Sequence, residues 1–234
     1  MVSMVKIKTL YNTHIMKIFL IIPSFNEGSR LHQTINKAKK YIAEKNIIVV
    51  DDGSRAPESL PKNSKATLIR HQLNLGKGMA MKTGAKYAFS QKADAIVYID
   101  ADLQHNPKYL PKFKKLLKTN DLVFASRRPS LNAPMVRLLG NKLASIYINI
   151  LFGIYVSDLL SGYRALNKKA FKLLNWTSPR YGVETEMVAR LGKNKHKLKW
   201  AEFPIETIYV NKYKGVTIID AIKILTNSIW WKLS

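Results

Sequence analysis

The sequence predicts an α/β fold in which a mostly parallel central sheet carries helices on both faces. In the first half of the chain, short apolar runs alternate with segments whose apolar residues recur at helical spacing. Such alternation is typical of strand–helix units that build a parallel sheet. Three of the apolar runs end in polar motifs, and sheets of this kind bind ligands beyond the carboxyl ends of their strands.

The elements of the first half follow in a regular order. Strands are predicted at residues 17–22, 46–50, 66–70, 95–99 and 121–125. Helices are predicted around Leu31, Ile35, Ala38 and Ile42, then at residues 76–90 and 107–117. The polar motifs at residues 23–27, 51–54 and 100–104 should therefore converge on one crevice.

The second half is less regular. A long amphipathic helix or helix pair is predicted at 136–152, a turn and short strand at 157–167, a helix at 183–191, an extended segment at 198–210 and a helical stripe at 216–231. The predicted division has an N-terminal extension at 1–15, poorly ordered or upstream of a start at Met16. A single α/β domain follows at 16–215, and then a C-terminal amphipathic helix at 216–234.

Charge and cysteine content narrow the function classes. The 234 residues contain 39 Lys and Arg against 15 Asp and Glu, a net charge of +24, and no cysteine. Such a surface attracts anions: nucleic acid, anionic lipid or phosphorylated substrates. The lack of cysteine excludes disulfides, zinc thiolates and a cysteine nucleophile. No stretch reads as a membrane span, because Arg137, Asn141, Lys142 and Asn149 interrupt the most apolar one.

Asp100 and Asp102 are the strongest functional signal. They stand directly after the apolar run at 95–99, so both carboxylates fall where a strand leaves the sheet. Two acids one residue apart pack poorly but are good ligands for a hard cation, which in turn could hold a diphosphate. An isolated pair of this kind is more often a solvated loop, and the further motifs in the chain favour the functional interpretation.

The other motifs each have a structural explanation when taken alone. Residues 23–27 read as a turn with a helix cap, and residues 51–54 as a tight turn around Gly53. Residues 74–78 open a helix with two glycines that would let a phosphate approach, and Lys77 adds a positive charge.

Taken together and in order, these motifs resemble the family 2 glycosyltransferases, which have the GT-A fold, and within them the dolichyl-phosphate mannose synthase and polyprenyl-phosphate glycosyltransferase branch. The resemblance covers about residues 17–217. The matching segments are Pro-Ser-Phe-Asn-Glu (23–27), Val-Val-Asp-Asp-Gly-Ser (49–54), Asn-Leu-Gly-Lys-Gly (74–78), Ile-Asp-Ala-Asp-Leu-Gln (99–104), Ala-Ser-Arg (125–127) and Asp-Leu-Leu-Ser-Gly-Tyr-Arg (158–164).

The resemblance implies a donor site for a UDP- or GDP-sugar. Asp100, Asp102 and Gln104 would hold Mg²⁺ or Mn²⁺ against the donor diphosphate. The donor-binding residues that it implies are Pro23, Phe25, Glu27, Asp51, Asp52, Lys77, Asp100, Ala101 and Asp102. Lys212 or Lys214 would replace a family arginine on the diphosphate, and Thr217 and Ile218 stand where relatives have Ser-Lys, so this segment departs from the family pattern.

The resemblance also implies a polyprenyl or dolichyl phosphate as acceptor. Arg127, Arg137 and Arg164 would bind its phosphate, and Asp102, Arg127 and Asp158 would be the catalytic residues. An alternative for Arg137 is a solvated helix start. Asp158 and Glu184 are acids that could assist the attack, and the alternative for Asp158 is the positioning of the turn at 161–164. His71, His105 and His196 are scattered, and no His–carboxylate base is evident. A phosphate acceptor needs no such base, because its second pKa of about 6 leaves it dianionic near neutrality.

A lipid acceptor requires access to a membrane. The predicted helices at 136–152 and 216–231, the latter with Trp230, Trp231 and Lys232, could lie in the interface of an anionic membrane on its cytoplasmic face, or pack on the sheet. One alternative function is transfer to a glycan or polysaccharide hydroxyl, against which the missing base counts. A nucleic-acid-binding domain is the other, and it is not favoured: the chain lacks a zinc, recognition-helix or RNP-like pattern, and strand-end acids would repel a phosphate backbone.

Overall fold

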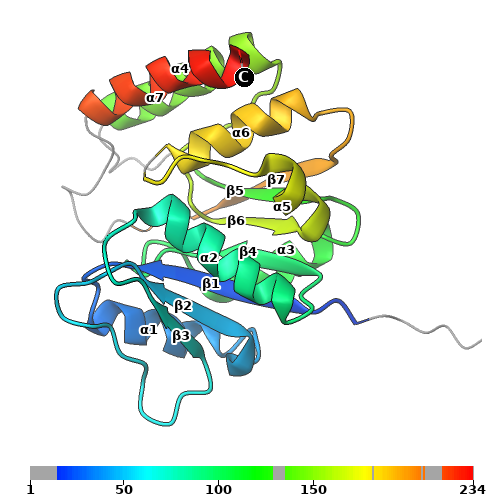
Figure 1. The fold of residues 1–234 in the computed structure, drawn as a ribbon. Coiled ribbons are helices and arrows are strands. Elements are labelled where there is room, and N and C mark those ends of the chain that lie inside the picture. The colour runs from blue at the N-terminus through cyan, green and yellow to red at the C-terminus, as the bar shows by residue number, and fades with distance from the viewer. Residues whose placement is uncertain (1–14, 129–134, 181, 207, 209–217, 234) are drawn as a thin grey trace, which may run out of the picture.

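A seven-stranded sheet runs through the part of the chain that the computed structural model describes, which is residues 15–128, 135–180, 182–206, 208 and 218–233. The strand order is β3-β2-β1-β4-β6-β5-β7. The strands are β1 (Ile18–Ser24), β2 (Ile47–Asp51), β3 (Thr67–Arg70), β4 (Ala95–Tyr98), β5 (Leu122–Arg127), β6 (Arg164–Asn167) and β7 (Trp200–Ile205). Helices cover both faces of this sheet, as predicted (Figure 1).

The sheet is parallel except at β6, which runs antiparallel to both of its neighbours, β4 and β5. The sequence predicted a short strand in this region but not its direction. The antiparallel insertion places the end of β5 and the start of β6 at the same edge of the sheet as the ends of β1, β2 and β4. The ends of β3 and β7, which are parallel to their neighbours, lie at this edge as well.

Alternation along β1 separates the two layers of the core. Ile18, Leu20 and Ile22 belong to one buried cluster, whereas Phe19 and Ile21 belong to the other. Successive strand residues point to opposite faces, so this run is buried on both sides. Each such side chain, fully buried, stabilises the fold by about 1.5–3 kcal/mol relative to an exposed one.

One face of the sheet is covered by α1 (Ser29–Ala38), the 3-10 turn η2 (Pro107–Tyr109) and α3 (Leu110–Leu116). Leu31, Ile35 and Ala38 of α1 are fully buried, as their spacing predicts. Ile42 was predicted to extend this helix, but α1 ends at Ala38, and Ile42 packs against the core from the turn that follows. A second 3-10 turn, η1 (Glu44–Asn46), leads into β2.

The opposite face carries α2 (Lys77–Ser90), α5 (Lys168–Leu174) and α6 (Val183–Lys193). Helix α2 lies close on β1 because Gly84 has no side chain: a Cβ there would stand 2.5 Å from Ile21. The sequence analysis missed α5, a seven-residue helix that begins where Asn167 accepts a hydrogen bond from the backbone of Ala170 at 2.9 Å. It directly follows β6, so its short apolar pattern merges with that of the strand.

Helices α4 (Met135–Phe152) and α7 (Ile218–Leu233) lie alongside each other at the end of the molecule farthest from β3, with α6 between them and the sheet (Figure 1). Region 136–152 is thus one helix rather than a pair. Trp231 is buried in this layer, and Ser228 of α7 donates to the hydroxyl of Tyr147 of α4 at 3.1 Å. None of the helices in the described residues has the length and apolar character to cross a bilayer.

Candidate active site

The loops that follow β1 and β2 are hydrogen-bonded to each other at the carboxyl edge of the sheet. The backbone N–H of Asp52 donates to the carbonyl of Ser24 at 2.8 Å, and that of Asn26 donates to the Ser54 hydroxyl at 2.9 Å. The motifs at 23–27 and 51–54 therefore form one wall. Phe25 is exposed on this wall, whereas Pro23 and Glu27 are partly buried.

Glu58 fixes this wall and was not found by sequence analysis. Its buried carboxylate accepts hydrogen bonds from the hydroxyl of Ser24 at 3.0 Å, from the N–H of Glu27 at 2.7 Å and from the N–H of Gly28 at 3.1 Å. A buried carboxylate must be satisfied in this way, because an unpaired one is costly. No sequence motif marks it, since it stands alone in a loop of ordinary composition.

Asp51 and Asp52 are both buried, and their carboxylates are engaged by the protein itself. Asp51 accepts from the N–H groups of Ser54 and Glu58 and pairs with Arg70. Burial opposes ionisation, but these hydrogen bonds lower the pKa of Asp51.

Asp52 accepts from the N–H of Gly76 at 2.7 Å and from Nδ1 of His71 at 2.8 Å, if that nitrogen carries the proton. Asp51 and Asp52 thus stabilise the loops that form the predicted donor pocket.

Gly76 and Gly78 admit the protein's own backbone. A Cβ on Gly76 would lie 2.3 Å from the carbonyl oxygen of Pro179, and one on Gly78 would lie 2.1 Å from that of Ser178. The N–H of Gly78 donates to the Pro179 carbonyl at 2.7 Å. The expectation that a phosphate approaches these glycines is therefore wrong: residues 178–179 fill that space.

Lys77, next to these glycines, lies between two carboxylates. Its ammonium is 2.7 Å from Oδ1 of Asp100 and 2.8 Å from Oε1 of Glu184. Burial opposes the charge, but Asp100 and Glu184 together raise the pKa of Lys77. Burial likewise opposes ionisation of Asp100, yet chiefly Lys77 lowers the pKa of Asp100 to about 2. Sequence analysis named Lys77 and Asp100 as donor-binding residues and Glu184 only as an acid that could assist transfer.

Asp102 and Gln104 continue the turn after β4. Oδ1 of Asp102 accepts from the N–H of Gln104 at 3.0 Å, and Leu103 between them has a positive φ of 69°. Burial, together with the charge of Asp100, raises the pKa of Asp102 to about 6. Two carboxylates this close destabilise each other, and a cation relieves that repulsion. Ala101 between them is buried in the core.

His105 stabilises this turn through a hydrogen bond to its backbone. Its Nδ1 accepts a hydrogen bond from the backbone N–H of Asp100 at 3.3 Å, and its ring lies 5.1 Å from that of Tyr163. Burial lowers the pKa of His105 to about 4, so the ring is neutral near pH 7. His105 is thus a buried polar side chain whose Nδ1 is satisfied within the fold.

The oxygen atoms that this turn offers as metal ligands fit a divalent cation that also binds a second molecule. Among the described residues, no group of three or more His, Asp or Glu side chains is placed to hold a metal ion alone. Two carboxylates and one amide, from Asp100, Asp102 and Gln104, fit Mg²⁺ or Mn²⁺ whose coordination is completed by phosphate oxygens.

Arg127 stands at the end of β5 and is held by Asp158. Nε of Arg127 donates to Oδ2 of Asp158 at 2.6 Å and Nη2 donates to Oδ1 at 2.9 Å. Burial opposes ionisation of Asp158, but Arg127 lowers the pKa of Asp158. Asn141 of α4 also donates to Oδ1, at 3.3 Å, which connects the outer helix layer to this pair. Asp158 thus fixes Arg127 in one orientation.

Arg164 does not face the crevice. It is fully buried, and its guanidinium donates to the carbonyls of Ser161, Glu184 and Leu159. These contacts hold the turn at 158–164 against α6. The expectation that Arg164 contacts an acceptor phosphate is therefore wrong. Its guanidinium instead binds backbone carbonyls and stabilises the fold.

For three of the predicted site residues the structure describes no side-chain position. Lys212 and Lys214 lie outside the described residues. Arg137 belongs to the first turn of α4, and its side chain is also outside the described part.

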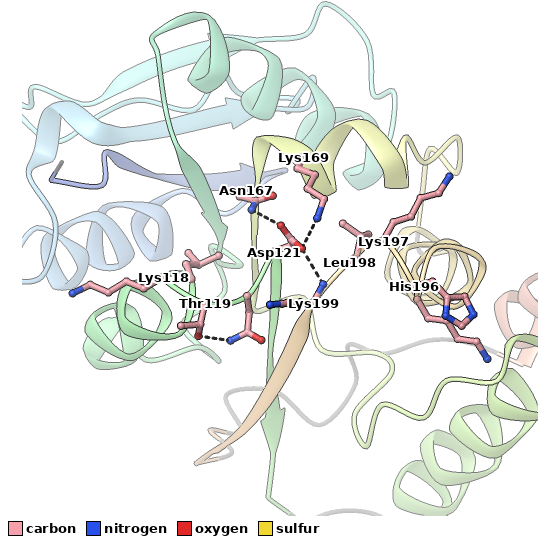
Figure 2. Close-up of a pocket in the computed structure, with 12 residues that line it drawn as sticks. Lys118, Thr119, Asp121, Asn167, Lys169, His196, Lys197, Leu198 and Lys199 are labelled. Carbon is pink, nitrogen blue, oxygen red and sulfur yellow. Dashed lines mark hydrogen bonds and ion pairs between the residues drawn. The ribbon is translucent and has the colours of Figure 1, made fainter. Parts of the chain in front are cut away.

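A hollow of about 400 Å³ lies at the opposite end of the sheet, where β5 and β7 begin (Figure 2). Its centre is Asp121, which accepts from Nδ2 of Asn167 at 2.8 Å, Nζ of Lys169 at 3.0 Å and the N–H of Lys199 at 2.9 Å. Because β5 separates Asp121 from Arg127 by six residues, about 20 Å, this hollow is remote from the candidate site.

Comparisons with known proteins agree on one family. Residues 19–174 match the family model described as Glycosyl transferase family 2. An uncharacterised protein of Methanocaldococcus jannaschii is 37% identical over 93% of each chain. The UDP-N-acetylglucosamine–dolichyl-phosphate N-acetylglucosaminyltransferase of Methanococcus voltae is 32% identical over 92% of this chain and 96% of that protein.

Among solved structures, the fold is similar to glucosyl-3-phosphoglycerate synthase from Mycobacterium tuberculosis in complex with Mn²⁺, UDP and phosphoglyceric acid. The TM-score is 0.68 at 18% identity, over 93% of this chain and 78% of the other. At that identity the likeness concerns the fold.

Proposed function

Since this chain belongs to glycosyl transferase family 2, in the branch that acts on polyprenyl phosphates, and has a GT-A fold, we propose that it transfers a sugar from a UDP- or GDP-sugar to a polyprenyl or dolichyl phosphate. Transfer inverts the anomeric centre in a single displacement. The bond from the anomeric carbon to the donor diphosphate breaks as a bond to an acceptor phosphate oxygen forms. The nucleoside diphosphate leaves with the electron pair.

The donor occupies the crevice between the wall of residues 23–27 and 51–54 and the turn after β4. Pro23, Phe25 and Glu27 line the base and ribose, while Asp51 and Asp52 support that wall and Lys77 faces the diphosphate. Asp100, Asp102 and Gln104 hold Mg²⁺ or Mn²⁺. When bound, the cation offsets the charge that develops on the departing diphosphate.

The acceptor phosphate binds to Arg127, with Arg137 as a second cationic contact and Asp158 as the residue that orients Arg127. A guanidinium presents paired N–H groups that match phosphate geometry. The dianionic phosphate attacks without a general base, since its second pKa is about 6. What the chain contributes is alignment: holding two reactants in line converts a bimolecular reaction into an effectively unimolecular one.

One observation carries this proposal: Arg127 and the Asp100–Asp102 turn share the same carboxyl edge, so a cation for the acceptor adjoins a carboxylate pair for the donor metal. The positive charge of Arg127 contributes to the lowered pKa of Asp100. This arrangement suits a reaction in which the acceptor phosphate attacks close to the donor diphosphate that leaves.

We also propose that the chain lies peripherally on an anionic membrane, at its cytoplasmic face, with α4 and α7 toward the lipid. Leu139, Leu143, Ile146 and Ile150 recur at helical spacing on α4 and are exposed, as is Trp230 of α7. An exposed apolar stripe beside lysines is typical of helices that lie in a membrane interface. Asn141, on the opposite face of the same helix, contacts Asp158, so α4 connects the proposed lipid side with the acceptor side.

The deciding experiment is incubation with UDP-glucose, UDP-N-acetylglucosamine or GDP-mannose and a polyprenyl phosphate, with and without Mn²⁺. A lipid-linked sugar phosphate that forms only with a divalent cation is expected from one of these donors. Transfer instead to a glycan hydroxyl, or no metal-dependent transfer from any nucleotide sugar, would overturn the proposal.

A further inference from the structure

The ammonium of Lys77 joins three parts of the fold that are distant in sequence. Lys77 is the first residue of α2, Asp100 follows β4, and Glu184 lies in the first turn of α6. The two ion-pair distances, 2.7 Å to Asp100 and 2.8 Å to Glu184, are those of short charge-assisted hydrogen bonds. Only about a quarter of the Lys77 and Asp100 side chains is exposed, and Glu184 is buried.

The surroundings hold this ammonium in place. A Cβ on Gly162 would stand 2.7 Å from Nζ of Lys77 and 2.8 Å from Oδ2 of Asp100, so the turn at 158–164 closes directly over the pair. Glu184 is itself fixed, because its backbone carbonyl accepts a hydrogen bond from Arg164 at 2.9 Å. A lysine held from two sides in this way is poorly placed to leave Asp100 unless another anion draws it.

We propose that Lys77 is a built-in counter-cation that competes with a divalent cation for Asp100, and that Glu184, the second carboxylate on its ammonium, draws part of that charge away from Asp100. This inference rests on the proposed function, in which Asp100 and Asp102 hold the donor's metal. An ammonium 2.7 Å from a metal ligand repels a metal that arrives alone. A donor diphosphate supplies the negative charge that satisfies both cations, so metal and nucleotide bind together.

The proposal makes opposite predictions for two binding measurements on Lys77→Gln. Binding of Mn²⁺ alone, followed by the electron paramagnetic resonance signal of free Mn²⁺, should tighten by about tenfold, because a cation beside the site is lost. Binding of UDP or GDP in saturating Mn²⁺ should weaken by about tenfold, because the diphosphate loses a partner. A merely structural lysine would weaken both.

Lys86→Gln is the matched control. Lys86 lies on the same helix, is exposed, and carries the same charge, so both affinities should stay at the wild-type value. Glu184→Gln gives a test of the opposite sign: Lys77 then keeps only Asp100, one carboxylate is lost, and Mn²⁺ alone should bind several-fold more weakly. Circular dichroism confirms that each variant is folded, and if Lys77→Gln does not fold, Glu184→Gln decides.

The outcomes separate this inference from the proposed function. If the wild-type chain binds no Mn²⁺ even with UDP or GDP, the metal-assisted donor site itself is wrong. If the wild type binds both but Lys77→Gln leaves the affinity for Mn²⁺ alone unchanged or weaker, the counter-cation role falls and the donor site stands. An unchanged or tighter Mn²⁺ affinity in Glu184→Gln overturns the role of Glu184.

Discussion

The guanidinium of Arg127 and the carboxylate of Asp158 form a two-point ion pair, with Nε to Oδ2 at 2.6 Å and Nη2 to Oδ1 at 2.9 Å. The backbone N–H of Arg127 donates to Oδ2 as well, at 3.1 Å. The pair lies 31 residues apart in sequence and links the end of β5 to the turn before β6. It fixes both the position and the plane of the cation proposed to meet the acceptor phosphate.

Asp158→Asn should therefore weaken acceptor binding more than donor binding. The amide keeps the size of the side chain but loses its charge and its two-point acceptance, so Arg127 loses its fixed orientation. We expect the KM for polyprenyl phosphate to rise by about tenfold, equivalent to about 1.4 kcal/mol, with the KM for the nucleotide sugar changed by less. Steady-state kinetics with each substrate varied in turn measure this. An unchanged acceptor KM would remove Asp158 from the acceptor site.

Asp102→Ala should abolish transfer while leaving the fold intact. The Asp102 carboxylate accepts a hydrogen bond from the N–H of Gln104 within its own turn, so removing it costs little structure. Loss of a metal ligand should lower the rate by at least about 100-fold. Transfer of labelled sugar and a circular dichroism spectrum check both halves. Glu206→Gln, on the exposed ion pair with Lys108, serves as the control that retains activity. Normal rates in Asp102→Ala would end the metal-site proposal.

Arg164→Met should destabilise the protein without changing acceptor affinity. The guanidinium of Arg164 is buried and donates to backbone carbonyls. The variant leaves those carbonyls unpaired, which should lower the free energy of unfolding by at least about 2 kcal/mol. Urea unfolding measures the loss, and kinetics on the folded fraction at low temperature measure the KM for polyprenyl phosphate. A large rise in that KM without loss of stability would restore Arg164 to the acceptor site.

Asp121→Asn should reduce stability in a pH-dependent manner. Hydrogen bonds from Lys199, Asn167 and Lys169 outweigh burial and lower the pKa of Asp121 in the folded state. Ionised Asp121 therefore stabilises the fold above its unfolded pKa of about 3.9, and this contribution disappears as the pH falls through the lower folded value.

We expect wild type to exceed Asp121→Asn by about 1–2 kcal/mol at pH 7 and by less at pH 3. Urea unfolding at both pH values measures it. Glu206→Gln, in an exposed ion pair with Lys108, should unfold at the same urea concentration as wild type at both pH values. A difference in the free energy of unfolding that is as large at pH 3 as at pH 7 would contradict this assignment.

Leu143→Glu combined with Ile150→Glu should impair membrane binding. Both side chains are exposed on α4, so the substitutions do not disturb the core. Burying two charges in the interface in place of two apolar side chains should lower the affinity for vesicles containing phosphatidylglycerol by more than about tenfold. Vesicle co-sedimentation measures this. Leu73→Glu, an exposed leucine elsewhere on the chain, is the control with unchanged binding. Equal binding by all three proteins would place the membrane contact on another surface.

The order of strands and helices, and the edge at which the motifs meet, could be predicted from the sequence. The apolar runs at 18–22 and 95–98 are buried on both sides of the sheet. A continuous apolar run of this length can be identified as a strand from the local sequence alone. The motif at 100–104 could be assigned to a strand end for the same reason. The antiparallel direction of β6 could not, because it depends on where the chain returns after α4.

The sequence by itself determined that a pair of acids and an arginine stand at strand ends, since strand ends follow from local periodicity. Only the tertiary structure decided what each polar group contacts. It placed Arg164 in the core and Pro179 on Gly76, and it brought Glu184 to Lys77 across 107 positions of sequence. Contacts of that range depend on how helices pack over the sheet, and no local pattern encodes the packing that sets them.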